Sequence, residues 1–166
     1  MRRVLVLLCA AAVFGLPTAD VARAVGQPAA RHSIVGVWQV EVTVRQDGPD
    51  CTVTPPVPFG QNPFPALNTF HKGGTVSETG SRSPPSRRSP GHGVWQRVGP
   101  GAYEARYTFQ VFDGNGFLSN IMDIRTDIEL AQDGRTFQGV SRFQFSDVSG
   151  NVVPFCATME AVRYGL

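Results

Sequence analysis

From Val37 onward, apolar and polar residues alternate with a period of two, and this pattern constrains the fold more than any other feature of the chain. Between residues 103 and 111, for example, every odd position is apolar and every even position is polar or charged. A strand that buries one face gives this pattern, because successive side chains point to opposite sides of a sheet. No helical stripe of apolar residues competes with it, so the sequence predicts an all-β fold.

Turn signals such as Asp113-Gly114-Asn115-Gly116 divide the alternating region into eight runs, since these residues adopt the positive φ of tight hairpins. The predicted strands cover residues 36–46, 64–72, 74–80, 92–98, 102–113, 117–131, 135–147 and 152–165. Consecutive strands with one apolar face can hide that face by closing into a barrel, which also removes exposed edges. We therefore predict an eight-stranded antiparallel up-and-down β-barrel, with a two-sheet sandwich as the alternative.

The N-terminus has the features of a cleavable signal peptide. Arg2 and Arg3 precede an uncharged apolar run, and Ala22-Arg23-Ala24 supplies a small-x-small cleavage site. The apolar run is shorter than the roughly 20 residues that cross a bilayer, so no stable membrane insertion is expected after cleavage. We predict a signal peptide over residues 1–24 and a single domain over residues 25–166. The protein would be secreted, or periplasmic if its source has an outer membrane.

Charge and cysteine content narrow the function classes. Loss of residues 1–24 removes three of the 15 basic and one of the 13 acidic residues, so the mature chain is electrically balanced. A nucleic-acid partner is disfavoured, because such proteins carry a basic excess. Only Cys51 and Cys156 remain after cleavage, and an even pair in an oxidising compartment predicts a disulfide.

Two segments interrupt the alternation. Residues 48–65 are rich in proline and predict a long loop at one mouth of the barrel. Residues 81–91 form a second loop, which contains Arg82, Arg87 and Arg88. We interpret this second loop as a solvated segment kept soluble by its charge, with an anion site as the alternative.

The first and last predicted strands carry a family resemblance. Gly36-Val37-Trp38 opens the first strand, and Arg163 lies near the end of the last. In this arrangement the chain resembles the lipocalin-like, or calycin, barrels of small secreted bacterial proteins. In that family a G-x-W motif starts the barrel and a late arginine packs over the tryptophan at the closed end. The resemblance implies structural roles for Gly36, Trp38 and Arg163.

Small residues are interleaved with aromatic ones on the inward parity, which predicts a cavity, although close packing of small against large side chains is the alternative. An aromatic wall with a few polar groups suits a mostly apolar small molecule. No glycine-rich loop precedes a helix and no zinc signature occurs, so neither cofactor nor metal is expected. The candidate ligand-binding residues are Tyr103, Tyr107, Phe109, Asn120, Met122, Ser141, Phe143 and Phe155.

Three functions fit this sequence. The leading hypothesis is a secreted barrel that sequesters or carries a hydrophobic ligand. The second is a cofactor-free cyclase or isomerase, with Glu78, His71, Tyr103 and Tyr107 as candidate catalytic residues, because burial would shift the pKa of an inward carboxylate or imidazole. His71 has a simpler interpretation as a rim residue of a hairpin. The third hypothesis is a protein-binding module that uses the loop at residues 48–65.

Overall fold

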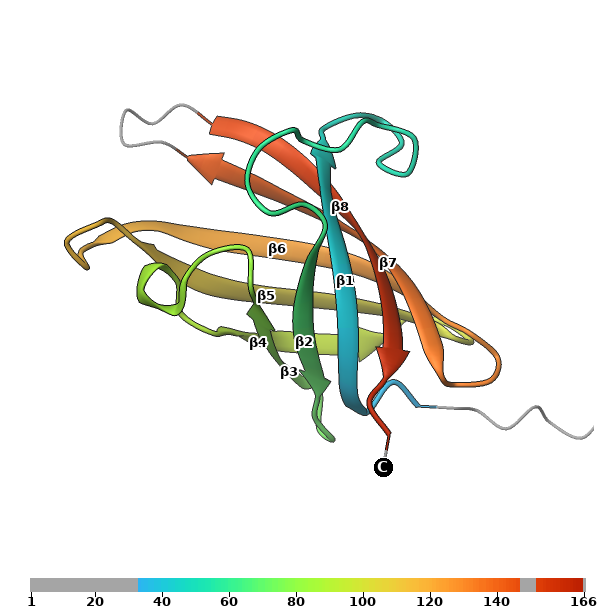
Figure 1. The fold of residues 1–166 in the computed structure, drawn as a ribbon. Helices are drawn as coiled ribbons and strands as arrows, with labels where there is room; N and C mark the ends of the chain where they lie inside the picture. The colour runs from blue at the N-terminus through green and yellow to red at the C-terminus, as the bar shows by residue number, and fades with distance from the viewer. Residues whose placement is uncertain (1–32, 147–151, 166) are drawn as a thin grey trace, which may run out of the picture.

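The computed structural model describes residues 33–146 and 152–165 and shows a closed barrel of eight antiparallel strands in chain order (Figure 1). Within these residues, no helix has the length and hydropathy of a membrane span. The predicted up-and-down barrel is confirmed, and the sandwich is excluded. The predicted signal peptide lies outside the described residues. The elements are β1 (Gly36–Gln46), β2 (Phe64–Phe70), β3 (Thr75–Gly80), the short 3-10 helix η1 (Pro85–Arg87), β4 (Gly91–Arg97), β5 (Ala102–Phe112), β6 (Leu118–Leu130), β7 (Thr136–Ser146) and β8 (Val152–Arg163).

The strand ends differ from the predicted ones by no more than two residues. The largest differences are at β8, which ends at Arg163 instead of residue 165, and at β2, which ends at Phe70 instead of residue 72. After β2 the next residues form a tight turn. There the His71 amide donates to the carbonyl of Thr75 at 2.8 Å, and the Gly74 amide donates to that of His71 at 3.3 Å. β1 pairs with β2 on one side and with β8 on the other, which closes the barrel.

The predicted alternation is observed along the strands. In β5, Tyr103, Ala105 and Tyr107 are buried while the residues between them are exposed. In β6, the buried positions run from Met122 to Leu130 at every second residue. The alternating side chains thus converge on one interior, which is the core of the molecule.

The end of the barrel that holds the start of β1 is filled by aromatic side chains. Trp38 is fully buried, and its ring meets that of Phe137 edge-on at a centroid distance of 4.8 Å. The Arg163 guanidinium lies 4.2 Å from the Trp38 ring centroid, a cation–π contact. It also donates to the carbonyls of Ser33, Val35 and Gly134 at 2.6, 2.7 and 2.8 Å. We call this closed end the plug.

Gly36 makes the approach of Arg163 to the plug possible. A Cβ atom at this position would lie 2.7 Å from Nη1 of Arg163, and the φ of +139° is one that side-chain-bearing residues rarely adopt. The structure therefore shows a local reason for glycine two residues before Trp38.

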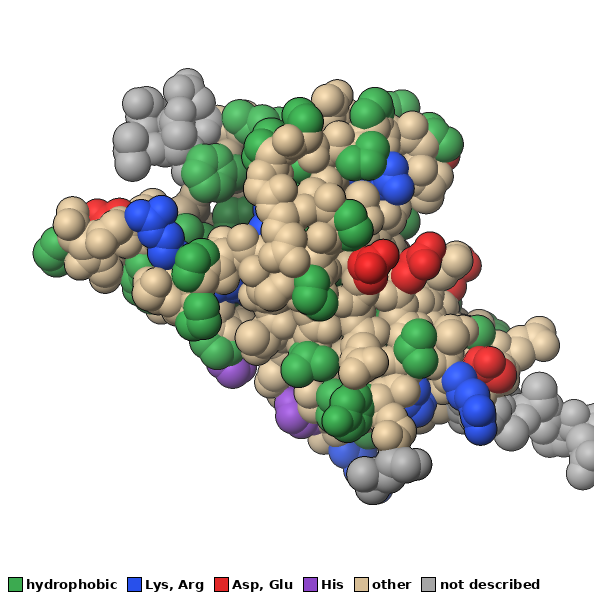
Figure 2. All heavy atoms as spheres, in the orientation of Figure 1, with side chains coloured by type: hydrophobic (Ala, Val, Ile, Leu, Met, Phe, Trp, Pro, Cys, Tyr) green, Lys and Arg blue, Asp and Glu red, His purple; other side chains and the backbone are tan. Residues whose placement is uncertain are grey.

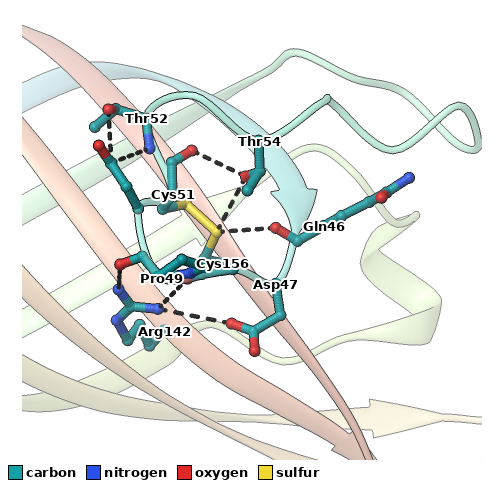
Figure 3. A network of polar contacts seen from close by, with 10 residues as sticks. Gln46, Asp47, Pro49, Cys51, Thr52, Thr54, Arg142 and Cys156 are labelled. Atoms are coloured by element: carbon teal, nitrogen blue, oxygen red, sulfur yellow. Dashed lines mark hydrogen bonds and ion pairs between the residues drawn. A yellow bond between two sulfur atoms is a disulfide. The ribbon is translucent and has the colours of Figure 1, made fainter.

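A disulfide joins Cys51 to Cys156, with the two Cα atoms 5.9 Å apart, as the cysteine count predicts. It fixes the β1–β2 loop to β8 (Figure 3). Beside it, the Arg142 guanidinium donates to the carbonyls of Gly48 and Pro49 at 3.3 Å each. The long loop at residues 48–65 is therefore held at several points.

Candidate functional site

A cavity of about 460 Å³ occupies the end of the barrel opposite the plug. This volume falls in the range of small-molecule sites, which is roughly 300–1,000 Å³. In Figure 2, apolar side chains gather around a hollow between the β5–β6 hairpin and the hairpin formed by the end of β7 and the start of β8. The interior is thus not filled throughout. Apolar residues of the wall are Val42, Val44, Phe64, Phe109, Met122, Ile124, Phe143, Phe155 and Met159.

The two halves of the interior differ because of where the large side chains lie. Near the plug, the ring of Phe137 meets those of Trp38 and Phe70 edge-on, and all three rings are buried. In the other half, inward positions are taken by small residues such as Ser141 and Ala157. These two residues are register partners on the adjacent strands β7 and β8, and their short side chains leave the space that the cavity occupies.

Six of the eight candidate ligand-binding residues lie on the cavity wall: Tyr107, Phe109, Met122, Ser141, Phe143 and Phe155. The other two do not. Tyr103 is buried toward the plug, where its ring lies 5.7 Å from that of Trp95, and Asn120 is half-buried near the start of β6. The structure brings the six together, and ligand binding by them stays a prediction.

A buried ion pair is the most polar feature of the cavity wall. Glu78 points inward from β3, and Arg88 folds back from the β3–β4 loop to meet it. The distance from Arg88 Nη2 to Glu78 Oε2 is 2.6 Å, and Nη1 to Oε1 is 3.4 Å. The two side chains are only 8% and 6% exposed. The guanidinium also lies 3.8 Å from the ring centroid of Phe109, so the pair is packed as well as hydrogen-bonded.

The interpretation of residues 81–91 as a solvated loop is therefore wrong for Arg88. The physical reason is the cost of an unpaired buried charge, which a carboxylate on an inward position would otherwise incur. An acidic residue on an apolar parity is itself the signal for such a partner, although it does not say which of the loop arginines supplies it. The pairing with Glu78 was not predicted from the sequence.

Burial alters the acid–base properties of the wall. It raises the pKa of Glu78, while the charge of Arg88 and its hydrogen bond oppose the rise. Burial also raises the pKa of Tyr107, and the nearby Glu78 carboxylate adds to the effect. Tyr107 is therefore a neutral phenol at physiological pH. The hydroxyl of Ser141, which lines the cavity, lies 2.7 Å from that of the buried Thr126.

Two glycines make room for the ion pair. A Cβ atom on Gly80 would lie 2.8 Å from Arg88 Nη1 and 2.9 Å from Glu78 Oε1. A Cβ atom on Gly91 would lie 2.9 Å from Glu78 Oε2. These separations are shorter than side chains tolerate, so the space around the carboxylate depends on both glycines.

The mouth of the cavity is formed by the two long loops. Arg82 lies 5.8 Å from the ring centroids of both Phe59 and Phe64, and it donates to the Phe59 carbonyl at 3.1 Å. The Phe59 ring in turn meets that of Phe155 edge-on at 6.4 Å. Arg82 thus joins the β3–β4 loop to the β1–β2 loop across the entrance.

The remaining acid–base candidates lie elsewhere. His71 is exposed in the β2–β3 turn at the plug end, where its Nε2 lies 3.2 Å from the hydroxyl of Ser77. The other histidine among the described residues, His92, is exposed on β4 and was not one of the four candidates. Of the four candidate catalytic residues, the cavity brings together Glu78 and Tyr107, but not His71 or Tyr103.

Asn68 is an inward polar residue that the sequence analysis missed. It is 3% exposed in β2, and its Oδ1 has no hydrogen-bond partner among the residues that the structure describes. Asn68 lies between the inward residues Ala66 and Phe70 on the same parity of β2, and this alternation could have predicted its inward direction.

Comparison with known protein families, curated proteins and solved structures finds no match for this chain. The closed eight-stranded barrel is compatible with a calycin-like fold. The resemblance rests on that topology together with Gly36, Trp38 and Arg163. In residues 33–146 and 152–165, no group of three or more His, Cys, Asp or Glu side chains is placed to hold a metal ion.

Proposed function

We propose that this barrel binds a small, mostly apolar molecule in the cavity at its open end. The observation that carries the proposal is a volume of about 460 Å³ lined by aromatic and aliphatic side chains in one half of the barrel, while buried aromatic rings pack against one another in the other half. Burial of apolar ligand surface against such a wall supplies the driving force for binding.

Export of the protein is part of the same proposal. The Cys51–Cys156 disulfide suits an oxidising compartment, and the basic and apolar residues at the N-terminus are typical of a signal peptide. A barrel exported in this way would sequester or carry its ligand outside the cytoplasm.

Nile red, a neutral dye that fluoresces in apolar surroundings, tests the proposal directly. We expect it to bind the purified mature protein, and we expect Val42→Phe to weaken binding by about tenfold or more, because Val42 lines the cavity. The matched control is Val94→Phe, the same change at an exposed position on β4, which should leave the affinity unchanged. Absence of binding by the wild type, or equal weakening by both variants, would refute the proposal.

A second candidate function is a cofactor-free cyclase or isomerase. It is favoured by Glu78 and Tyr107, which face the cavity with raised pKa values and lie on adjoining parts of its wall. Incubating a hydrophobic extract of the source organism with wild type and with Glu78→Gln separates the two functions. An enzyme accumulates a product that the variant does not form, whereas a carrier leaves the composition unchanged.

The protein-binding hypothesis for the loop at residues 48–65 gains no support from the geometry. Phe59, the aromatic residue at the centre of that loop, lies at the cavity mouth against Phe155. This contact favours a role for the loop in shaping the entrance.

A further inference from the structure

The Glu78–Arg88 pair has more hydrogen-bonding capacity than the protein uses, and it lies on the wall of an otherwise apolar cavity. We propose that this pair makes the cavity selective for ligands with a neutral head group that both donates and accepts hydrogen bonds, such as a hydroxyl, and that Glu78 excludes carboxylates. The inference rests on the proposed ligand-binding function and names the class of ligand.

The opposite charges of the pair make the cavity unfavourable for a ligand carboxylate. Arg88 alone would make the cavity a site for fatty acids or other apolar anions. Glu78 neutralises it at 2.6 Å, so an entering carboxylate meets one positive and one negative charge instead of a free cation. In a buried site, where charges are poorly screened, a second carboxylate beside one guanidinium is strongly disfavoured.

The hydrogen bonds within the pair leave one donor on Arg88 and acceptor capacity on Glu78 for a ligand. Arg88 has five N–H groups, of which Nε donates to the Ser89 carbonyl, Nη1 donates to Glu78 and to the Gly80 carbonyl, and Nη2 donates to Glu78. The second N–H of Nη2 has no acceptor among the described residues. Each Glu78 oxygen accepts one hydrogen bond from Arg88 and has a further lone pair. A ligand hydroxyl can therefore accept a hydrogen bond from this N–H of Arg88 and donate one to a carboxylate oxygen of Glu78.

The packing around the pair holds both side chains in one orientation. The Phe109 ring lies beneath the guanidinium at 3.8 Å, and Gly80 and Gly91 leave the space that the carboxylate occupies. The orientation of the pair is therefore fixed before a ligand enters, which lowers the entropic cost of recognition. A buried ion pair is seldom a net source of stability compared with well-packed apolar residues, so its presence in the cavity is better explained by recognition.

The experiment compares two ligands of equal chain length, dodecanol and dodecanoate, by displacement of Nile red from the mature protein at about pH 8, where the acid is ionised. We expect the wild type to bind dodecanol about tenfold or more tightly than dodecanoate. We expect Glu78→Gln to gain affinity for dodecanoate by a similar factor, because Arg88 then faces the cavity as an uncompensated cation.

Two further variants make the result specific. In the double variant Glu78→Gln with Arg88→Met, the gain in dodecanoate affinity should disappear, since the cation is gone. Glu104→Gln, an equivalent change at an exposed position on β5, should keep the wild-type preference. Melting curves establish that each variant is folded, and the comparison of the two ligands on the wild type stands even if one variant is not.

The outcomes separate this inference from the proposed function. Failure of the wild type to bind either ligand or Nile red counts against the ligand-binding proposal. Binding of both ligands with equal affinity, a preference for dodecanoate, or an unchanged preference in Glu78→Gln overturns the inference and leaves the ligand-binding proposal in place.

Discussion

Each end of the barrel places an arginine against an aromatic ring, but the two arginines have different partners. At the plug, Arg163 lies over the fully buried Trp38 and donates to three backbone carbonyls. In the cavity, Arg88 lies over the half-buried Phe109 and pairs with the side chain of Glu78. Backbone carbonyls are supplied by any sequence with this fold, whereas a carboxylate is a choice of residue. The comparison teaches that the plug arginine is held by groups that come with the fold, whereas the cavity arginine depends on one carboxylate, which agrees with the role in recognition that we propose for it.

The largest expected difference between the two ends is in their contribution to stability. Trp38→Ala should lower the free energy of unfolding by about 3–5 kcal/mol, because it removes a fully buried ring from a packed cluster. Phe143→Ala should cost less, because Phe143 is half-buried on the wall of an existing cavity. Urea denaturation of both variants measures the difference. Equal losses would mean that the open half is as tightly packed as the plug.

The next largest effect concerns the covalent link at the open end. Replacing Cys51 and Cys156 together by serine should lower the free energy of unfolding by about 2–4 kcal/mol, because the reduced unfolded chain is less constrained. The variant should also bind Nile red more weakly, since the loop that carries Phe59 is then less firmly held at the mouth. Wild type treated with a reductant is the control. An unchanged affinity would show that the loop keeps its place without the bridge.

A smaller effect is expected on the part of the pH dependence of stability that Glu78 contributes from the cavity wall. Because burial raises the pKa of Glu78 above its ordinary value of 4.5, the folded protein holds this proton more tightly than the unfolded chain does. The resulting contribution is fully present below pH 4.5 and is lost as the pH rises through the raised pKa. The stability of wild type relative to Glu78→Gln should therefore fall across this interval in urea titrations. Parallel pH profiles would contradict the assignment.

The smallest effect on stability is expected on the outer surface of the barrel, away from the plug and the cavity. Arg106 on β5 and Asp123 on β6 form an ion pair on the outer surface, where both side chains are exposed. Arg106→Ala should leave the denaturation midpoint nearly unchanged, and added salt should reduce the difference further, because solvent screens exposed pairs. A large decrease in the denaturation midpoint would contradict this expectation and would show that the exposed pair contributes substantially to stability.

The sequence was sufficient to predict the fold, because the period of two and the turn residues specify strands and hairpins locally. It also indicated that Tyr107, Phe109 and Phe143 face one interior, since parity decides the face of a strand. The plug was predicted through the family resemblance that Gly36, Trp38 and Arg163 carry. In the structure, Trp38 and Arg163 are register partners of β1 and β8.

The site was harder to predict, because part of it lies on a loop. No periodicity indicates where a loop side chain points, and the composition of residues 81–91 is typical of solvated segments. Arg88 was missed for this reason. Tyr103 was predicted on the cavity wall because parity gives the face of a strand but not the depth along the barrel. Depth depends on strand stagger, which turn chemistry does not reveal.

The Cys51–Cys156 disulfide lies where the first and last strands of the barrel meet. In an up-and-down barrel every neighbouring pair of strands is joined by a turn except the first and the last, and Cys156 lies opposite Arg45 in that pair. The bridge to Cys51 therefore fastens the one junction that the backbone leaves open. A protease that cuts the chain once between the two cysteines would produce a nicked molecule whose two pieces stay covalently joined until a reductant breaks the bridge.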